Sequence, residues 1–292
     1  MPGFPKSLAE AVNNFNFAIV ILSFLHKQPK KNIMKKFFII ASALFFLMPF
    51  VLKSQVNTAA KPNDTLNRTD ASGLKTGFWE EKAGDVTLKG YFKLNKKEGS
   101  WVGFYPSNVL ARIDTYKDGQ KDGPYIQLDR RGKITLYEYY RNGLLNGQQV
   151  SYAPSGDFPV SETNYVNGKR NGLYRLYYDN GKIQEESDYV ENQKNGSSKW
   201  FNKGGKLLAE YNYKLGNFEG IQKTFYDNDT LQILSSYTNN ELSGDYKEFY
   251  RNGKLKMTGK YIKGQKDGPW TEYDETGKSE KVTKFKAGTN PK

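Results

Sequence analysis

The sequence predicts an all-β chain, an elongated single antiparallel sheet built from about nine tandem β-hairpin units of about 24 residues. Three observations predict it. A glycine opens each unit at steps of 22 to 25 residues, at positions 77, 99, 123, 147, 172, 196, 220, 244 and 268. Seven Asn-Gly and three Asp-Gly pairs supply hairpin turns. No window from 77 to 288 combines a helical period with helix caps.

The N-terminal region reads as a targeting segment. Residues 37–52 form an apolar run of 16 residues that follows Lys35 and Lys36. This is the pattern of a secretory signal peptide, which we assign to 34–54 with cleavage near Ser54-Gln55. The alternative is an uncleaved anchor helix, although the run falls short of the ~20 residues that a membrane span needs. Residues 1–33 are an upstream extension, which would not be translated if Met34 is the start.

The remaining boundaries follow from composition. Residues 55–76 are polar and without a hydrophobic period, so we expect a flexible polar linker. The repeat array occupies 77–288, and 289–292 are a tail. We therefore expect an exported chain, located in the periplasm, in the outer envelope or outside the cell. Removing residues 1–54 lowers the net charge from +13 to +7, because they hold seven Lys and one Glu.

Within each unit, residues of one kind recur at fixed places counted from the opening glycine as position 0. The repeat tyrosines occupy position 17 or 18: Tyr116, Tyr140, Tyr165, Tyr189, Tyr213, Tyr237 and Tyr261. Position 9 is usually a glycine that we expect to be a structural turn residue: Gly132, Gly181, Gly205, Gly253 and Gly277. A lone hairpin is too small to be stable, so we expect neighbouring units to stack into one sheet of about eighteen strands.

The hairpin register stays open between two alternatives. If Asn180-Gly181 is a two-residue loop, position 6 pairs with position 11, and positions 2, 6, 11 and 17 share a face. If the loop has three residues and a glycine bulge, position 5 pairs with position 11 instead. In both cases we expect one packed face and a second face that carries an aromatic ladder.

The unit resembles the MORN-repeat family, and most closely its bacterial variant, whose tandem copies are often labelled toxin–antitoxin antitoxin components. The stretches that carry the resemblance are GDYKEFYRNGKLKMTGKYIKGQKDG, residues 244–268, and GLYRLYYDNGKI, residues 172–183. The resemblance covers about 77–288. It implies a β-hairpin array that serves as a scaffold for contact with proteins or membranes, and it brings no catalytic residues.

Composition excludes most common enzyme mechanisms. The chain has no Cys, and its one His, His26, lies ahead of the predicted cleavage site. The array therefore lacks an imidazole base, a thiol nucleophile and metal ligands of the His or Cys type. Gly204-Gly205-Lys206 and Asp227-Asn228-Asp229 resemble fragments of phosphate and calcium loops, but both lie at expected turns and lack the remaining motif residues. We expect no catalytic residue, no metal and no cofactor.

A binding role is then the main functional prediction. The candidate binding residues are the large aromatics at position 2: Trp79, Trp101, Tyr125, Tyr174, Tyr246 and Trp270. Exposed Trp and Tyr suit protein contacts, whereas buried ones would belong to the core. We predict a secreted or periplasmic scaffold that is not an enzyme and that binds another protein. The alternatives are a glycan- or membrane-surface-binding module and an antitoxin-like protein that neutralises a partner toxin by direct binding. Nucleic acid is not an expected partner, and the oligomeric state is left open.

Overall fold

The structure is a computed structural model that describes residues 66–286. The predicted upstream extension, the signal peptide, residues 55–65 of the linker and the tail lie outside the described residues. Residues 66–76, which we assigned to the linker, include a turn closed by an isolated bridge between Thr69 and Lys75. The sheet belongs to one unit that begins at Thr69. No helix among residues 66–286 is long and apolar enough to cross a membrane.

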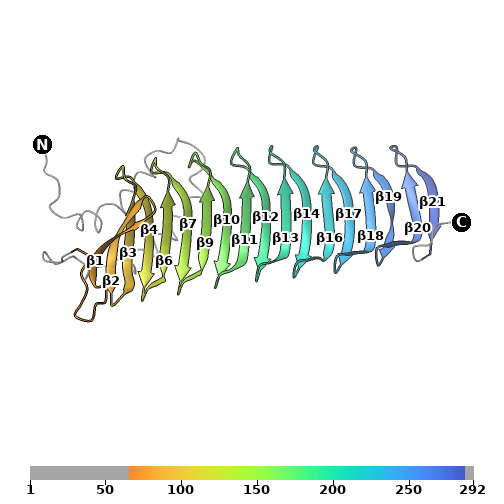
Figure 1. The fold of residues 1–292 in the computed structure, drawn as a ribbon. Coiled ribbons are helices and arrows are strands. Elements are labelled where there is room, and N and C mark those ends of the chain that lie inside the picture. The colour runs from red at the N-terminus through yellow and green to blue at the C-terminus, as the bar shows by residue number, and fades with distance from the viewer. Residues whose placement is uncertain (1–65, 287–292) are drawn as a thin grey trace, which may run out of the picture. The chain divides into compact units, whose positions relative to one another are not determined.

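The predicted all-β sheet is confirmed, with 21 strands in one antiparallel sheet (Figure 1). Their bounds are β1 Gly77–Ala83, β2 Val86–Lys93, β3 Lys96–Phe104, β4 Leu110–Lys117, β5 Gln120–Lys121, β6 Gly123–Leu128, β7 Ile134–Arg141, β8 Leu144–Leu145, β9 Gly147–Tyr152, β10 Pro159–Val166, β11 Lys169–Tyr177, β12 Ile183–Val190, β13 Gln193–Phe201, β14 Leu207–Lys214, β15 Asn217–Phe218, β16 Gly220–Phe225, β17 Leu231–Thr238, β18 Glu241–Phe249, β19 Leu255–Ile262, β20 Gln265–Tyr273 and β21 Ser279–Phe285.

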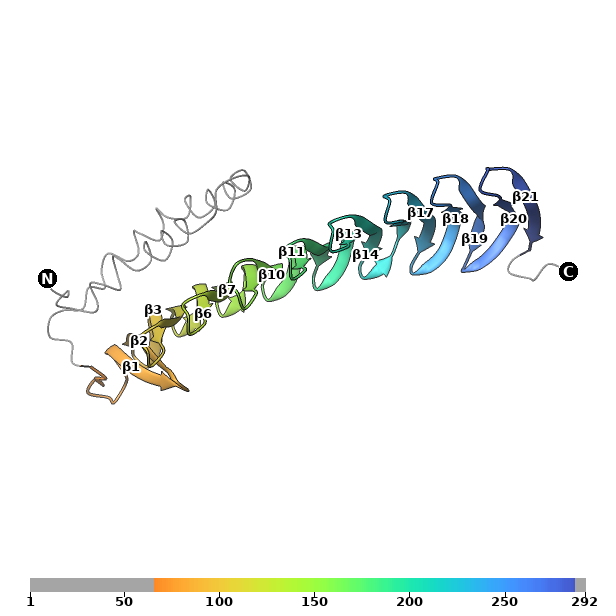
Figure 2. The same ribbon diagram turned by 90° about the horizontal axis from the view of Figure 1, so that it is seen from above.

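Strands that follow one another in the chain are neighbours in the sheet, except where one strand is interrupted and counted as two. β4 pairs with both β5 and β6, β7 with both β8 and β9, and β14 with both β15 and β16. Each of the two-residue strands β5, β8 and β15 is thus the first part of one interrupted strand. Joining the three to their successors turns 21 strands into the eighteen that nine hairpins require. Figure 2 shows the hairpins succeeding one another along the sheet from β1 to β21.

The loops along one edge of the sheet settle the register that the sequence left open. In the unit of Gly172, Tyr177 pairs with Ile183, so position 5 pairs with position 11. The amide of Gly181 donates to the carbonyl of Tyr178 at 2.9 Å, and the amide of Tyr178 donates to the carbonyl of Lys182 at 2.8 Å. This is the three-residue loop with a left-handed third residue and a bulge. The two-residue alternative is wrong.

The opposite edge carries two-residue turns in which both central residues have positive φ. In Asp118-Gly119 the two φ values are 51° and 84°, the pattern of a type I′ turn. The nine unit glycines also have positive φ, from 68° to 132°. Those from Gly99 onward lie where the returning strand is interrupted or bulged. Side chains with a Cβ rarely adopt a positive φ. The repeating glycine that first marks the units in the sequence is therefore a backbone requirement.

The two faces of the sheet differ from the expectation. Register and alternation place positions 2 and 17 on the same face, as the ring contact of 5.8 Å between Tyr174 and Tyr189 shows. This face, here called the tyrosine face, also carries the buried cluster of Leu88, Phe92 and Trp101. The predicted division into one packed face and a separate ladder face is wrong, because buried apolar residues lie on both faces: Phe92 and Trp101 on the tyrosine face, and Val102 and Val150 on the opposite face.

The opposite face changes character along the sheet. At position 3 it carries aliphatic residues in the earlier strands, among them Val102, Ile126 and Val150. From β11 onward the same position is mostly charged: Arg175, Lys199, Lys223 and Lys247. Arg175 and Lys223 pair with Glu186 and Glu210 on the neighbouring strands, at 2.8 and 3.2 Å. Such cross-strand ion pairs favour the observed strand register and keep the later part of that face hydrophilic.

Candidate partner-binding face

All six predicted ladder residues lie on the tyrosine face. Trp79 and Tyr125 stand in β1 and β6, and Tyr174 and Tyr246 stand in β11 and β18; these four side chains are half-buried. The remaining two, Trp101 and Trp270, are only 0% and 2% exposed. These two tryptophans are core residues and have no surface to offer a partner. The accessible ladder therefore consists mainly of tyrosines.

The seven repeat tyrosines extend this ladder along the same face. Each is half-buried, with its ring in the sheet surface. Burial raises the pKa of Tyr116, Tyr213 and Tyr261 above the usual value of a phenol. At position 2 of the unit that begins at Gly244, burial and the neighbouring Glu248 raise the pKa of Tyr246 to about 12. These hydroxyls stay protonated at neutral pH, so the face presents neutral hydrogen-bond donors.

A cation stands over the aromatic rings in six units. It comes from the residue two places before the unit glycine, at position −2. The Lys97 Nζ lies 3.9 Å from the Trp101 ring centroid and 5.6 Å from that of Tyr116. The six cations are Lys75, Lys97, Lys121, Arg170, Lys194 and Lys266. Cation–π contacts of this kind hold the long side chain along the face and stabilise the aromatic pair beneath it.

Two of these cations, Lys121 and Lys194, also lie near buried carboxylates. Lys194 lies 2.7 Å from Glu185, which is 6% exposed. Asp114, 2% exposed, lies 2.9 Å from the Arg112 Nε and 3.8 Å from the Lys121 Nζ. Burial raises the pKa of Asp114 even though these cations act in the opposite direction. Much of the charge on the earlier part of the tyrosine face is thus already neutralised within the sheet.

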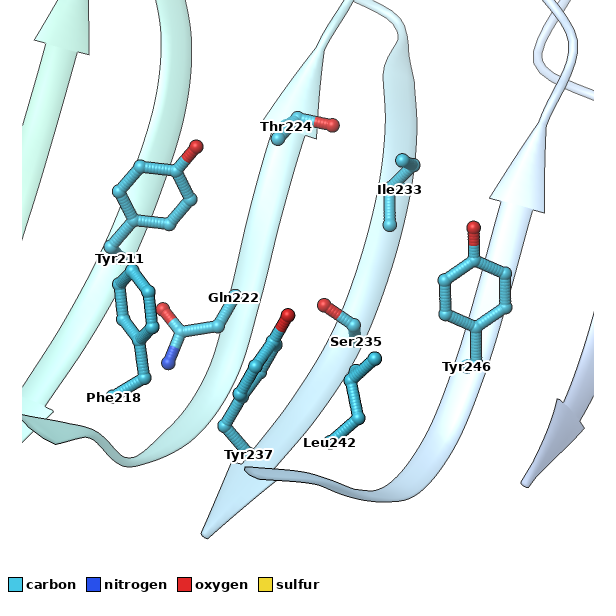
Figure 3. A pocket seen from close by; sticks show the side chains of 9 residues that line it. All are labelled: Tyr211, Phe218, Gln222, Thr224, Ile233, Ser235, Tyr237, Leu242 and Tyr246. Carbon is cyan, nitrogen blue, oxygen red and sulfur yellow. The ribbon is translucent and has the colours of Figure 1, made fainter. Parts of the chain in front are cut away.

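Two successive units lack the cation. Position −2 is Phe218 before β16 and Leu242 in β18, and the same place in an earlier unit is Leu145. The Phe218 ring lies 4.8 Å from that of Tyr213 and 5.4 Å from those of Tyr211 and Tyr237. A hollow of about 260 Å³ opens here, lined by Tyr211, Phe218, Gln222, Thr224, Ile233, Ser235, Tyr237, Leu242 and Tyr246 (Figure 3). None of these nine side chains carries a charge at neutral pH.

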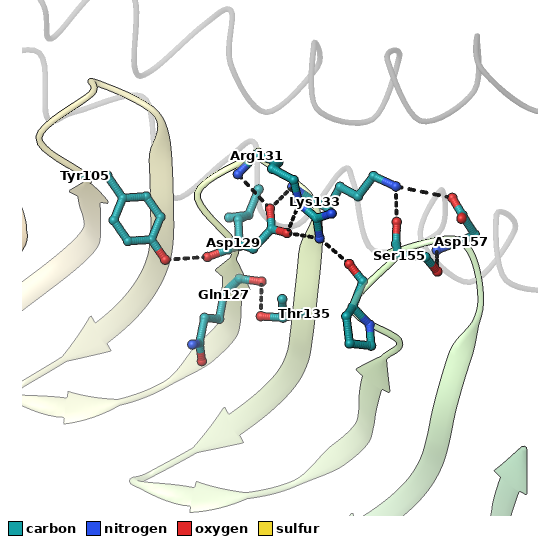
Figure 4. Close-up of polar contacts among 10 residues, drawn as sticks. Tyr105, Gln127, Asp129, Arg131, Lys133, Thr135, Ser155 and Asp157 are labelled. Atoms are coloured by element: carbon teal, nitrogen blue, oxygen red, sulfur yellow. Dashed lines mark hydrogen bonds and ion pairs between the residues drawn. The ribbon is translucent and has the colours of Figure 1, made fainter. Parts of the chain in front are cut away.

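Hydrogen bonds link each unit to the next along the edge that carries the three-residue loops. The hydroxyl of Tyr105 donates to the carbonyl of Leu128 at 2.9 Å, and Lys133 reaches over to the carbonyl of Ser155 (Figure 4). The same tyrosine contact recurs from Tyr178 to Phe201 at 2.9 Å. The five predicted turn glycines occupy the third loop position with φ from 75° to 91°: Gly132, Gly181, Gly205, Gly253 and Gly277. This edge holds neighbouring hairpins at a fixed spacing.

The candidate phosphate and calcium fragments both lie in these loops. Gly205 takes the left-handed position, and Gly204 and Lys206 bond through their amides to the Asn202 side chain. Asp227-Asn228-Asp229 forms the equivalent loop, with Asp229 at φ 68°. No group of three or more potential metal ligands occurs within residues 66–286. Both fragments act as turns.

Comparison with known families agrees with this architecture. The family described as MORN repeat variant matches six stretches, residues 97–118, 170–191, 194–215, 218–239, 242–263 and 266–287. The chain belongs to the MORN-repeat family. MORN repeats generally mediate interactions with proteins or membranes. No curated protein matches the chain.

The MORN matches and the structure divide the chain in the same way. Every matched stretch begins at position −2, the residue that is a cation in most units and Phe218 or Leu242 in two. Residues 119–169 carry no match, yet β6 to β10 continue the same hairpins there. The one 25-residue step between unit glycines, from Gly147 to Gly172, begins within this unmatched part. The fold therefore tolerates more sequence variation than the family signature does.

Sequence reasoning missed the importance of position −2. The signal is present, because aligning the units on their glycines shows Lys or Arg at that place in six of nine units. The cation acts only through its neighbours, and its contact with rings of the following unit appears once the hairpins are assembled.

Proposed function

We propose that this MORN-repeat protein is a non-enzymatic scaffold that binds another protein through its tyrosine face. The observation that carries the proposal is the ladder of half-buried tyrosines, which continues through successive units and is not covered by any other part of residues 66–286. Among the described residues the sheet has no second layer. Tyrosine is the residue type that protein interfaces favour, because it combines apolar area with a polar tip.

The proposal also places the protein outside the cytoplasm. Its support is the basic, then apolar, then polar order of residues 34–54. Cell fractionation of a C-terminally tagged chain, followed by N-terminal sequencing, tests this step. Recovery from the envelope or medium with Gln55 at the amino end is the expected result. Recovery of an uncut chain from the cytoplasm would contradict export and would favour the antitoxin-like alternative.

Mild crosslinking of the tagged chain in cell-envelope extract tests the binding step. We expect a protein partner to be captured by the wild-type chain and lost in Tyr237→Ala, since Tyr237 stands in the uncharged part of the ladder. The matched control is Lys247→Ala, on the opposite face of the neighbouring β18. Failure to capture any protein would reject the scaffold. Retention on polysaccharide or liposomes in its place would support the glycan- or membrane-surface alternative.

A further inference from the structure

The uncharged hollow on the tyrosine face has the character of a groove for a peptide. It spans the two successive units whose position −2 residues are Phe218 and Leu242. Small-molecule and cofactor pockets usually enclose about 300–1,000 Å³. A hollow of about 260 Å³ along an open sheet suits a few side chains of a longer ligand better than a whole cofactor.

The polar groups in the hollow can donate hydrogen bonds to a ligand. The Thr224 hydroxyl is buried and has no hydrogen-bond partner within the described residues. Tyr211 and Tyr237 line the same hollow, with their hydroxyls well apart from each other (Figure 3). Gln222, 4% exposed, uses its amide group within the sheet, on the backbone of Asn212. The Thr224 hydroxyl is therefore available to donate to a ligand group that lacks a partner of its own, such as a backbone carbonyl.

The spacing of the ladder selects among peptide conformations. Neighbouring strands lie roughly 4.7–4.9 Å apart, so a two-strand unit advances about 9.4–9.8 Å. A polyproline II helix advances about 9.3 Å in its three-residue turn, and every third residue returns to the same side. One turn of polyproline II is therefore only about 0.1–0.5 Å shorter than the advance of one two-strand unit. An α-helix repeats after about 10.5 Å in seven residues. An extended strand returns to one side every two residues, after about 6.6–6.8 Å.

We propose that the hollow binds a proline-rich segment of a partner protein in the polyproline II conformation, with one turn per MORN unit. This inference rests on the proposed scaffold function and names its partner class. Residues i and i+3 of the segment lie at the Phe218 and Leu242 units, against Tyr211, Tyr237 and Tyr246. Aromatic-lined grooves recognise such helices because the ligand loses little conformational entropy on binding.

The cations on the two sides of the hollow favour one direction of the bound peptide chain. On one side Lys194 is already paired with Glu185 at 2.7 Å. On the other side Lys266 lies over Trp270 and Phe285, at 4.1 and 5.4 Å from the ring centroids, and has no carboxylate partner among the described residues. It stands one unit beyond Leu242, which is one further turn of the ligand. An acidic residue three places after the apolar pair, counted toward β20, would meet Lys266.

Fluorescence anisotropy with the full chain and labelled nine-residue peptides tests the proposal. The probe is a repeat of Pro-Pro-Leu with Asp placed at either end, and the control peptide replaces every Pro with alternating Gly and Ser. We expect one of the two Asp peptides to bind at least tenfold more tightly than the control peptide. Lys266→Met should remove the advantage of that peptide over one without Asp.

Leu242→Lys provides the decisive variant, because it installs the cation that six other units carry. It should weaken peptide binding at least tenfold by placing an ammonium group over the hollow. Leu145→Lys is the matched control, since it makes the same change in a unit outside the hollow, and it should leave binding unchanged. If circular dichroism shows that Leu242→Lys unfolds the sheet, Leu242→Gln makes the hollow polar without a charge and should also weaken binding.

The outcomes separate this inference from the scaffold proposal. Equal affinity for the proline-rich and Gly/Ser peptides, or equal effects of the two lysine variants, would overturn the polyproline assignment. If a partner is still captured through Tyr237 in that case, the scaffold function stands and only the ligand conformation is wrong. Preferential binding of a neutral β-linked oligosaccharide that competes at the hollow would also overturn it, in favour of a glycan ligand.

Discussion

The indole of Trp270 packs directly onto the backbone of Gly259. A Cβ at Gly259 would stand 2.3 Å from the Trp270 ring, and the indole N–H donates to the carbonyl of Lys260 at 3.2 Å. Gly90 and Trp101 repeat the arrangement near the other end of the described array. A Cβ at Gly90 would stand 2.4 Å from the Trp101 ring, and the Trp101 indole N–H donates to the carbonyl of Tyr91 at 3.1 Å. A glycine on one strand thus makes room for a buried tryptophan on the next.

Gly259→Ala should loosen the C-terminal units. The added methyl overlaps the indole, and overpacking of this kind costs about 1–3 kcal/mol. Because repeat arrays unfold locally, the loss should appear as faster amide hydrogen exchange in β19 to β21 with little change in β3 to β7. Gly204→Ala is the control, since its φ is ordinary and its nearest neighbour is a loop side chain at 3.0 Å. Equal exchange in both variants would show that Trp270 moves aside freely.

Leu215→Asn should stabilise the chain. Leu215 holds a left-handed conformation, with φ 48°, at the first position of a type I′ turn, and its side chain is 58% exposed. A left-handed residue with an ordinary side chain costs roughly 1–2 kcal/mol, and Asn reduces that cost. Urea unfolding should therefore give a gain of about 0.5–1 kcal/mol. A loss of stability would mean that the Leu215 side chain makes favourable contacts that outweigh its backbone strain.

Lys97→Met should destabilise the first units, in which the lysine side chain is half-buried. The ammonium group lies 3.9 Å from the Trp101 ring centroid and 3.1 Å from Glu81. Its removal should cost about 1–2 kcal/mol in urea unfolding followed by tryptophan fluorescence. Lys117→Met, at an exposed position in the neighbouring β4, should change stability by less than about 0.5 kcal/mol. Indistinguishable effects would show that position −2 contributes no more than a surface charge.

Asp114→Asn should change the pH dependence of stability. Burial raises the pKa of Asp114 above 3.8, although Arg112, Lys121 and Lys97 oppose the shift. The native state then binds the proton more tightly than the unfolded state, so the contribution of Asp114 is most favourable at low pH and is lost as pH rises through its native pKa. Relative to Asp114→Asn, the wild type should lose stability as the pH rises from acid toward neutral, above the usual pKa of an aspartate.

Unfolding free energies of the two chains across that pH range provide the measurement. Asn keeps the shape of the side chain but does not titrate, so the difference between the two curves isolates Asp114. A wild-type chain that gains stability over the variant with rising pH would mean that the ion pair with Arg112, at 2.9 Å, outweighs the cost of burial.

The fold could be predicted because its determinants are local. Type I′ turns, third-position loop glycines and the unit glycines all impose positive φ, and sequence periodicity exposes such residues directly. The choice of loop at Asn180-Gly181 could not be made, because Asn-Gly suits both a two-residue turn and the end of a three-residue loop. That choice decides whether position 5 or position 6 pairs with Ile183.

The candidate site was only partly predictable because it depends on contacts between units. The position 2 aromatics could be named, but the burial of Trp101 and Trp270 depends on Gly90 and Gly259 across the sheet. The hollow arises where Phe218 and Leu242 replace cations that stand over the next unit. Such a substitution is visible in an alignment of the units, but its consequence appears only once the register is known.

Site-specific photo-crosslinking in living cells tests the central claim most directly. Replacing Tyr237 with p-benzoylphenylalanine puts the probe on the tyrosine face, and replacing Lys247 puts it on the opposite face of the adjacent strand. The account predicts a discrete crosslinked protein from position 237 and none from position 247. Crosslinking only from position 247, or none at Tyr237 with the protein folded, would contradict a scaffold that works through its tyrosine face.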